Sequence, residues 1–472
     1  MLRGAFLLGI SQVVLVLTGF ILNIYLGRTL GPQLYGIFGV MSTFIVINEF
    51  LLIRGIYDAI SKLVAEKEES TSAMINSIFK GVTIGSFTVG FIYFLFAGQI
   101  AKILNDHELT DYIRLSAFII PITAMSTVFI GALNGLRMFG RQVVISITFH
   151  IVRLCAVIIF VLLGFSVKGA IIGLIISDLF KLAMARGFYK PVGTDRVLDR
   201  KKILRFIFEL MLTSVFSALI SNIDLIAVKA LLKENLETGL YTSAITISKI
   251  PQFLIIPISL ALMPVLSKSI SEKNSELTQK YVIQSLRLLL IIVLPISLII
   301  MATSEKCIAL LYGDSYIRAS EPLNILLLGA IFLSIKVVMF NVMVAEGKPR
   351  YIIYIGILSL VIDIILLMTL TNRMGLMGAA IASAVTHFLG FAISYRYVAR
   401  KFMIHKAWKS LVRIIAASVV IYMAAVFYSP SGIVLVLYYG ILSLVYVFIL
   451  IGLKEISLMD LIRKGRIGGE SL

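Results

Sequence analysis

Long apolar runs dominate this chain and limit what it can fold into. About fourteen runs of roughly 20 residues follow one another, each long enough to cross about 30 Å of hydrocarbon as a helix. In lipid, every backbone polar group needs an internal partner, so a spanning segment is a helix or part of a closed barrel, and barrel strands are much shorter than these runs. The sequence therefore predicts an all-α integral membrane protein. The runs cover 4–26, 35–57, 73–97, 111–133, 142–164, 167–188, 203–229, 239–266, 281–301, 322–345, 351–371, 375–395, 410–428 and 431–453.

Composition agrees with this interpretation. The chain is 59% hydrophobic and only 14% charged, well outside the usual range of soluble domains. No loop between the runs is long enough to fold as a soluble catalytic domain.

Basic residues predict the orientation in the membrane. The loops on the side of the N-terminus contain 26 lysines and arginines, and the opposite loops contain 7. The positive-inside rule then places both termini in the cytoplasm. The expected location of the chain is the plasma membrane. This distribution also accounts for the net charge of +18, because the charges are scattered over short loops. No nucleic-acid partner is expected.

Other ligand signals are weak. The two cysteines, Cys155 in mid-helix and Cys307 in an outer loop, are not expected to form a disulfide. The four histidines have no metal-ligand spacing, so neither a metal nor another cofactor is expected.

Three landmarks recur at nearly one offset and predict an internal repeat. Gly169-Ala170-Ile171-Ile172-Gly173 returns as Gly378-Ala379-Ala380-Ile381-Ala382, Leu34-Tyr35 returns as Leu240-Tyr241, and the basic turn at Gly135 returns at Gly347. Each copy contains six runs, an even number, so both copies enter the membrane from the same side as parallel repeats. The predicted parts are an N-lobe (1–188), a cytoplasmic linker (189–202), a C-lobe (203–400) and a last part with two further helices and a tail (401–472).

The string Gly27-Arg28-Thr29-Leu30-Gly31-Pro32-Gln33-Leu34-Tyr35-Gly36, the recurring Gly-Ala blocks and the basic turns carry a family resemblance. Over essentially its whole length the chain resembles the multidrug/oligosaccharidyl-lipid/polysaccharide exporter superfamily. With fourteen helices it looks most like the Wzx-type polysaccharide-export flippases, and the fourteen-helix lipid II flippases are close to it. Read without the family, the string itself predicts a tight outer turn made by Gly27, Gly31 and Pro32.

The resemblance implies a MATE-like fold and export of a polyprenyl-diphosphate-linked oligosaccharide by alternating access. Its implied partners are that lipid-linked glycan, membrane lipids and polysaccharide assembly enzymes. A lipid II flippase, a drug or cation antiporter, and a polytopic glycosyltransferase or polymerase remain as alternatives. The first outer loop lacks the carboxylate that such enzymes usually have there, so no catalytic residue is expected.

In the superfamily, helices one, two, seven and eight line the central cavity, and here they are unusually polar. Their polar residues are candidates for substrate binding, and two carboxylates are candidates for coupling to Na⁺ or H⁺ if a coupling ion is used. Lys249 lies near mid-depth just before Pro251, so we expect helix eight to bend there. The binding candidates are Lys249, Arg54, Asn23, Asn48, Asn222 and Lys229, and the coupling candidates are Glu49 and Asp224.

Four further ionisable residues lie inside helices five, six, eleven and twelve. A charge in mid-bilayer costs several kcal/mol unless it faces protein or water. Arg153 and Asp178 are predicted at similar depth on neighbouring helices, and the repeat offset gives Asp363 and His387 in the second lobe. The sequence predicts one structural pair in each lobe, Arg153 with Asp178 and Asp363 with His387.

Overall fold

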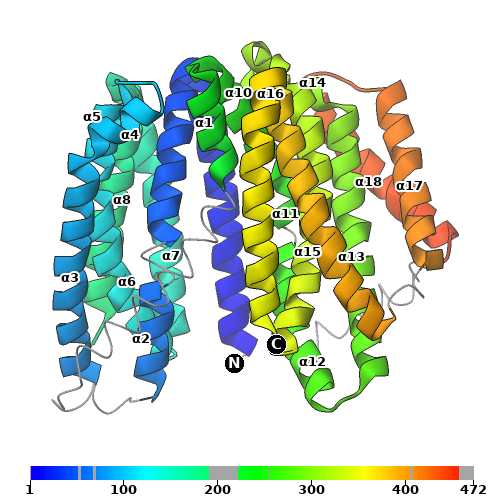
Figure 1. Ribbon diagram of the computed structural model, residues 1–472, viewed down its shortest axis with the longest axis horizontal. Helices are drawn as coiled ribbons and strands as arrows, with labels where there is room; N and C mark the ends of the chain where they lie inside the picture. The colour runs from blue at the N-terminus through cyan, green and yellow to red at the C-terminus, as the bar shows by residue number, and fades with distance from the viewer. Residues whose placement is uncertain are drawn as a thin grey trace. The chain divides into compact units, whose positions relative to one another are not determined.

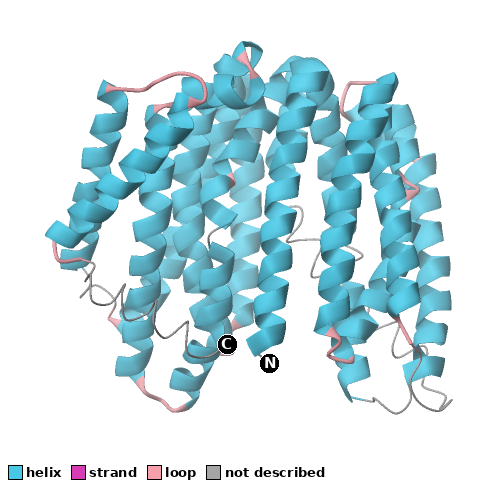
Figure 2. Cartoon of the chain, turned by 180° about the vertical axis from the view of Figure 1, so that it is seen from behind, coloured by secondary structure: helices cyan, strands magenta, loops and turns pink. Residues whose placement is uncertain are grey.

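The computed structural model describes residues 2–50, 55–66, 71–190, 222–253, 255–403 and 408–455. Every regular element in these ranges is a helix, and no strand occurs in them (Figures 1 and 2). The predicted all-α fold is confirmed.

The chain divides into two compact units, Met1–Thr242 and Ser243–Leu472. The predicted linker, 189–202, lies almost wholly outside the described residues, so the lobe bounds stay predictions. The first unit contains α1 (Leu2–Glu49), α2 (Gly55–Glu66), α3 (Thr71–Leu95), α4 (Ala97–Ile103), α5 (Leu109–Ser116), α6 (Ile119–Gly135), α7 (Phe139–Phe160), the π-helical η2 (Val161–Phe165), α8 (Ser166–Phe188), a helix over 222–232 and most of α10 (Asn235–Ser248).

The second unit continues from α10. It contains α11 (Ile250–Phe253), α12 (Ile255–Ser271), α13 (Ser275–Ala302), α14 (Ser304–Tyr312), the 3-10 helix η3 (Asp314–Ala319), α15 (Ser320–Ala345), α16 (Pro349–Phe402), α17 (Trp408–Phe427) and α18 (Val434–Gly452).

Three glycines reverse the chain within apparently continuous helices. Gly31 in α1 has φ 71°, Gly164 between α7 and α8 has φ 88°, and Gly375 in α16 has φ 59°. Positive φ costs glycine little because it has no Cβ. The two halves of α16 are visible as adjacent antiparallel rods in Figure 1. The predicted tight turn at Gly31 and Pro32 is thus confirmed.

Because of these reversals, one long helical stretch can cross the membrane twice. Nine helical stretches among the described residues are long and apolar enough to cross a membrane. Three of them, Gly9–Glu49, Phe139–Phe188 and Pro349–Phe402, are 41, 50 and 54 residues long, enough for two crossings each. The predicted run 203–229 falls mostly outside the described ranges, so the count of fourteen stays a prediction.

The same backbone turn ends a helix in each half of the chain. After α6, Arg137 has φ 56° and the Met138 N–H donates to the Leu133 carbonyl at 2.9 Å. After α15, Gly347 has φ 73° and the Lys348 N–H donates to the Met343 carbonyl at 3.0 Å. This is the left-handed cap that commonly ends helices. The repeated turns predicted near Gly135 and Gly347 are therefore equivalent in structure.

Close helix packing explains the recurring Gly-Ala blocks. A Cβ on Gly169 would lie 2.7 Å from the Phe160 carbonyl oxygen, and one on Gly173 would lie 2.7 Å from the Val157 Cα atom. In the second half, a Cβ on Gly378 would overlap the Leu370 carbonyl oxygen. Small residues let helix backbones approach closely where lipid provides little hydrophobic driving force.

Candidate functional site

A buried ion pair lies inside the first unit. The Asp178 carboxylate and the Lys181 ammonium, one turn apart on α8, are paired, and their side chains are only 4% and 8% exposed. Thr123 of α6 donates a hydrogen bond to Asp178 Oδ1 at 3.0 Å. Burying a single charge would be costly, and this pairing together with the hydroxyl offsets much of that cost.

Further charges surround this pair. Glu49, near the end of α1, interacts electrostatically with Arg153, Asp178 and Lys181. The Lys181 Nζ atom lies 4.3 Å from the centroid of the Phe149 ring, and the Arg153 Cζ atom lies 5.9 Å from it, both within cation–π range. The cluster thus contains two acidic and two basic side chains.

The predicted partner of Asp178 is wrong. Among the described residues Arg153 forms no ion pair, and its Nε atom has no hydrogen-bond partner. Asp178 pairs with Lys181 instead, because residues three positions apart lie on the same face of one helix. This pairing does not depend on how the neighbouring helix is rotated.

The second unit also contains a buried cluster of polar and charged side chains. Thr386 donates a hydrogen bond to Asp363 Oδ1 at 3.0 Å, joining the two halves of α16. Lys336 of α15 is 7% exposed and interacts electrostatically with Asp363. The Nδ1 atom of His387 forms no hydrogen bond with any residue that the structure describes. The predicted Asp363–His387 pair is therefore wrong, and the hydroxyl of the adjacent Thr386 takes its place.

Sequence reasoning missed both buried lysines. Lys181 was detectable from its i,i+3 spacing to Asp178, and Lys336 from being a cation in the middle of the run 322–345. Each unit thus holds a threonine–aspartate hydrogen bond next to a buried lysine.

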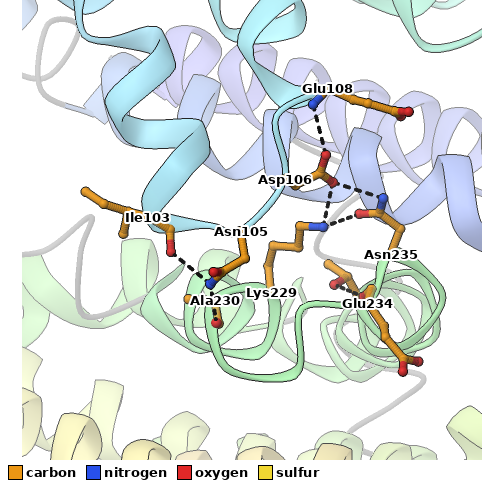
Figure 3. A network of polar contacts seen from close by, with 9 residues as sticks. Ile103, Asn105, Asp106, Glu108, Lys229, Ala230, Glu234 and Asn235 are labelled. Carbon is orange, nitrogen blue, oxygen red and sulfur yellow. Dashed lines mark hydrogen bonds and ion pairs between the residues drawn. The ribbon is translucent and has the colours of Figure 1, made fainter.

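A second polar network lies at the end of the first unit where α1 turns at Gly31. The Lys229 ammonium forms an ion pair with Asp106 Oδ2 at 2.6 Å and donates to Asn235 Oδ1, and Asn235 Nδ2 donates to Asp106 Oδ2 at 3.0 Å (Figure 3). The Lys229 side chain is 1% exposed and that of Asp106 is 10% exposed. These three residues, here called the Lys229 network, tie the α4–α5 loop to the 222–232 helix and to α10.

The network stabilises the charged form of its carboxylate. Burial works to raise the pKa of the Asp106 carboxyl, but hydrogen bonds from Lys229, Asn235 and the Glu108 N–H, with the Lys229 charge, hold that pKa below its usual range. A lowered pKa means that this stabilisation is complete above the ordinary carboxyl pKa of about 3.9 and is lost as the pH falls through the folded-state value.

We expect Asn235→Ala to lower the free energy of unfolding by about 1.5–3 kcal/mol at neutral pH, because it removes hydrogen bonds to charged groups. The difference from wild type should shrink below about pH 4, as Asp106 becomes protonated in both proteins. Unfolding of the detergent-purified protein at several pH values measures it. Asn372→Ala is the control, since the exposed Asn372 side chain bonds only within its own helix. An equal loss in both variants would contradict the assignment.

Helix backbones meet directly beside the Lys229 network. A Cβ on Gly36 would overlap the Asn235 carbonyl oxygen, and one on Gly239 would overlap the Pro32 carbonyl oxygen. The second half of α1 and the start of α10 therefore pack in backbone contact at glycines. This contact explains why residues 222–242 cluster with the first unit.

Some predicted site residues form hydrogen bonds or ion pairs with other residues of the chain. The Asn23 amide donates to the Gly19 carbonyl oxygen at 2.8 Å and accepts from the Tyr35 hydroxyl at 3.0 Å, which links the two halves of α1. Lys229 is enclosed in its network. Asn48 and Glu49 line a small cavity of about 10 Å³ with Ser116 and Thr123.

The remaining candidates lie near breaks in the chain. The exposed Lys249 lies between the end of α10 and the start of α11, two residues before Pro251, so predicted helix eight is interrupted where a bend was expected. Asn222 and Asp224 are half-buried in the 222–232 helix, where Asp224 Oδ1 accepts from the Leu225 N–H at 2.9 Å. Arg54 lies outside the described residues.

The sequence is similar to those of known proteins. A family model described as "Polysaccharide biosynthesis protein" matches residues 25–321, more than half of the chain. The chain belongs to that family. A proposed O-antigen transporter of Shigella flexneri is 26% identical over 386 residues, which cover 76% of this chain and 88% of that relative.

Solved structures agree on the fold of this family member. The inward-closed lipid II flippase MurJ aligns with a TM-score of 0.78 at 16% identity, over 98% of this chain and all of its own. An inward-facing MATE-family multidrug transporter of the MOP superfamily aligns with a TM-score of 0.69 at 16% identity, over 85% of this chain and 99% of its own. The predicted MATE-like fold is confirmed.

Proposed function

We propose that this protein is a flippase that carries a polyprenyl-diphosphate-linked oligosaccharide from the cytoplasmic to the outer leaflet of the plasma membrane. The observation that carries the proposal is the polysaccharide-biosynthesis family match over residues 25–321. The similarity to a proposed O-antigen transporter of Shigella flexneri and the fold shared with MurJ support it.

Physical chemistry explains why such a substrate needs a protein. Moving an unpaired hydroxyl from water into hydrocarbon costs about 4–8 kcal/mol on the cyclohexane scale, and an oligosaccharide has many hydroxyls. A polar passage removes most of this barrier, while the lipid tail stays in the bilayer.

Voltage can drive export of such a substrate. A diphosphate diester with about two negative charges gains roughly 4.6 kcal/mol per 100 mV when it leaves a cell that is negative inside. The positive-inside asymmetry of 26 to 7 basic residues supports the matching orientation, with both termini in the cytoplasm. Export then needs no coupling ion, although Glu49 and Asp224 remain candidates for binding one.

Alternating access accounts for the two repeats. Two similar helix bundles that rock about a site near mid-membrane expose it to each side in turn. Lys249 is our main candidate for the diphosphate contact, because it is an exposed cation at a helix break near mid-depth. Substituting other polar groups of helices one, two, seven and eight should alter glycan recognition more than the diphosphate contact.

A lipid II flippase is the second candidate, because the structural likeness to MurJ extends over 98% of the chain. Lipid II is also a polyprenyl-diphosphate glycan, so the two functions differ in the sugar portion and not in the charged group.

Reconstitution distinguishes these functions. Purified protein in proteoliposomes is given a fluorescent polyprenyl-diphosphate oligosaccharide, fluorescent lipid II, or a cationic dye, under an imposed membrane potential. Transport of the oligosaccharide above protein-free vesicles, accelerated by the potential, is the expected result. Faster transport of lipid II would select the second candidate, and transport of the dye alone would overturn both.

A further inference from the structure

A groove lies at one end of the second unit, between the end of α15 and the two ends of α16. Figure 1 shows the first and last residues of α16 at the same, lower end of its helices. The groove has a volume of about 730 Å³, within the usual size range of ligand pockets. Its polar lining is basic and aromatic, and it includes Lys348, Tyr351, Tyr354, Arg396, Tyr397 and Arg400.

The acidic residue beside this groove, Glu346, already has two partners. The Glu346 side chain is 3% exposed, forms an ion pair with Lys401 and accepts a hydrogen bond from the Tyr397 hydroxyl at 2.8 Å. Lys401 is thereby neutralised. Within the described residues, the other cations of the groove have no acidic partner.

Three cations remain at the groove. Arg396 and Arg400, exposed and one turn apart on α16, form no ion pair with any residue in the described part of the chain. The Lys348 Nζ atom lies 5.7 Å from the ring centroids of both Tyr351 and Tyr397. Lys348 thus lies beside tyrosines from both halves of α16, and it lines the same groove as Arg396 and Arg400.

An apolar surface continues from the groove toward the middle of α16. Ile355 and Leu358 line the groove itself. Leu358, Val361, Ile365 and Met368 follow each other at helical spacing and are 48%, 50%, 56% and 57% exposed. This stripe fits hydrocarbon chains, whereas the basic end fits a phosphate headgroup.

We propose that this groove binds a phospholipid with two phosphates in its headgroup, of the cardiolipin class, from the leaflet that the positive-inside rule predicts to be cytoplasmic. Arginine pairs with phosphate oxygens in a bidentate way, and basic pockets between membrane helices suit such headgroups. Three basic side chains that line one groove, Lys348, Arg396 and Arg400, suit a headgroup with more than one phosphate.

The test measures lipid binding to the detergent-purified full-length protein. Cardiolipin, phosphatidylglycerol, phosphatidylcholine and undecaprenyl diphosphate are compared by native mass spectrometry or by displacement of a fluorescent lipid. We expect cardiolipin to bind tightest. The double variant Arg396→Gln with Arg400→Gln should weaken its binding at least about tenfold, and Arg396→Lys with Arg400→Lys should weaken it less, because lysine keeps the charge but loses the bidentate contact.

A matched control removes the same charge elsewhere in this unit. Lys268→Gln with Lys273→Gln neutralises two exposed lysines around the end of α12 and should leave cardiolipin binding unchanged. Equal losses in both double variants would reduce the effect to general surface charge and overturn the site. Equal affinity for phosphatidylglycerol would overturn the two-phosphate assignment, and preference for undecaprenyl diphosphate would make the groove a substrate site. None of these outcomes depends on flipping activity.

Discussion

Replacing Lys249 by alanine is expected to slow oligosaccharide flipping about ten- to hundredfold while the protein stays folded and inserted. A hydrogen bond to a charged group contributes about 1.5–3 kcal/mol, which corresponds to that range. Lys249 suits this contact because it is an exposed cation at the break between α10 and α11, two residues before Pro251. Lys249→Arg should keep part of the activity, since a diffuse diphosphate contact depends more on charge than on shape.

The proteoliposome assay measures this effect, with Lys268→Ala as control. Lys268 is also an exposed lysine of the second unit, at the end of α12, with its side chain 78% exposed. The Lys268→Ala variant should flip substrate at the wild-type rate. Wild-type rates from Lys249→Ala would remove Lys249 from the substrate path and leave Arg54 as the main cation candidate.

The second large effect concerns the buried Asp178–Lys181 pair. Lys181→Met should lower the free energy of unfolding by about 3–5 kcal/mol, because it leaves a buried carboxylate without its counter-charge. Asp178→Asn together with Lys181→Met should recover much of that loss, since no lone charge remains. Chemical unfolding in detergent of the wild type, both single variants and the double variant completes the cycle.

An exposed ion pair provides the comparison. Lys168 and Asp111 lie 3.6 Å apart with side chains 54% and 66% exposed, so Lys168→Met should cost less than about 1 kcal/mol. A double variant as unstable as the sum of the two singles would mean that Asp178 and Lys181 do not act as a pair. Arg153→Ala, by contrast, should cost less than Lys181→Met, because Asp178 keeps its partner.

Much of the fold was predictable from sequence. The apolar runs fixed an all-helical membrane protein, and the confirmed turn at Gly31 and break at Lys249 followed from glycine and proline chemistry. The repeat was visible because the same glycines serve the same close contacts in both halves, as at Gly169 and Gly378.

The polar partners were not predictable in the same way. Depth and repeat symmetry suggested Arg153 for Asp178 and His387 for Asp363, but the structure gives Lys181 with Thr123 in one unit and Thr386 in the other. The Lys229 network was missed because Asp106 and Asn235 are far from each other along the chain and their proximity depends on how α4, α5 and α10 pack.

The sequence by itself determined which segments cross the membrane and where the chain turns, because hydrocarbon thickness and backbone hydrogen bonding act on each segment separately. Only the tertiary structure decided which buried charges meet. A partner depends on the rotation of each helix about its axis and on how closely neighbours approach, and those are set by packing at small residues such as Gly36, Gly173 and Gly239.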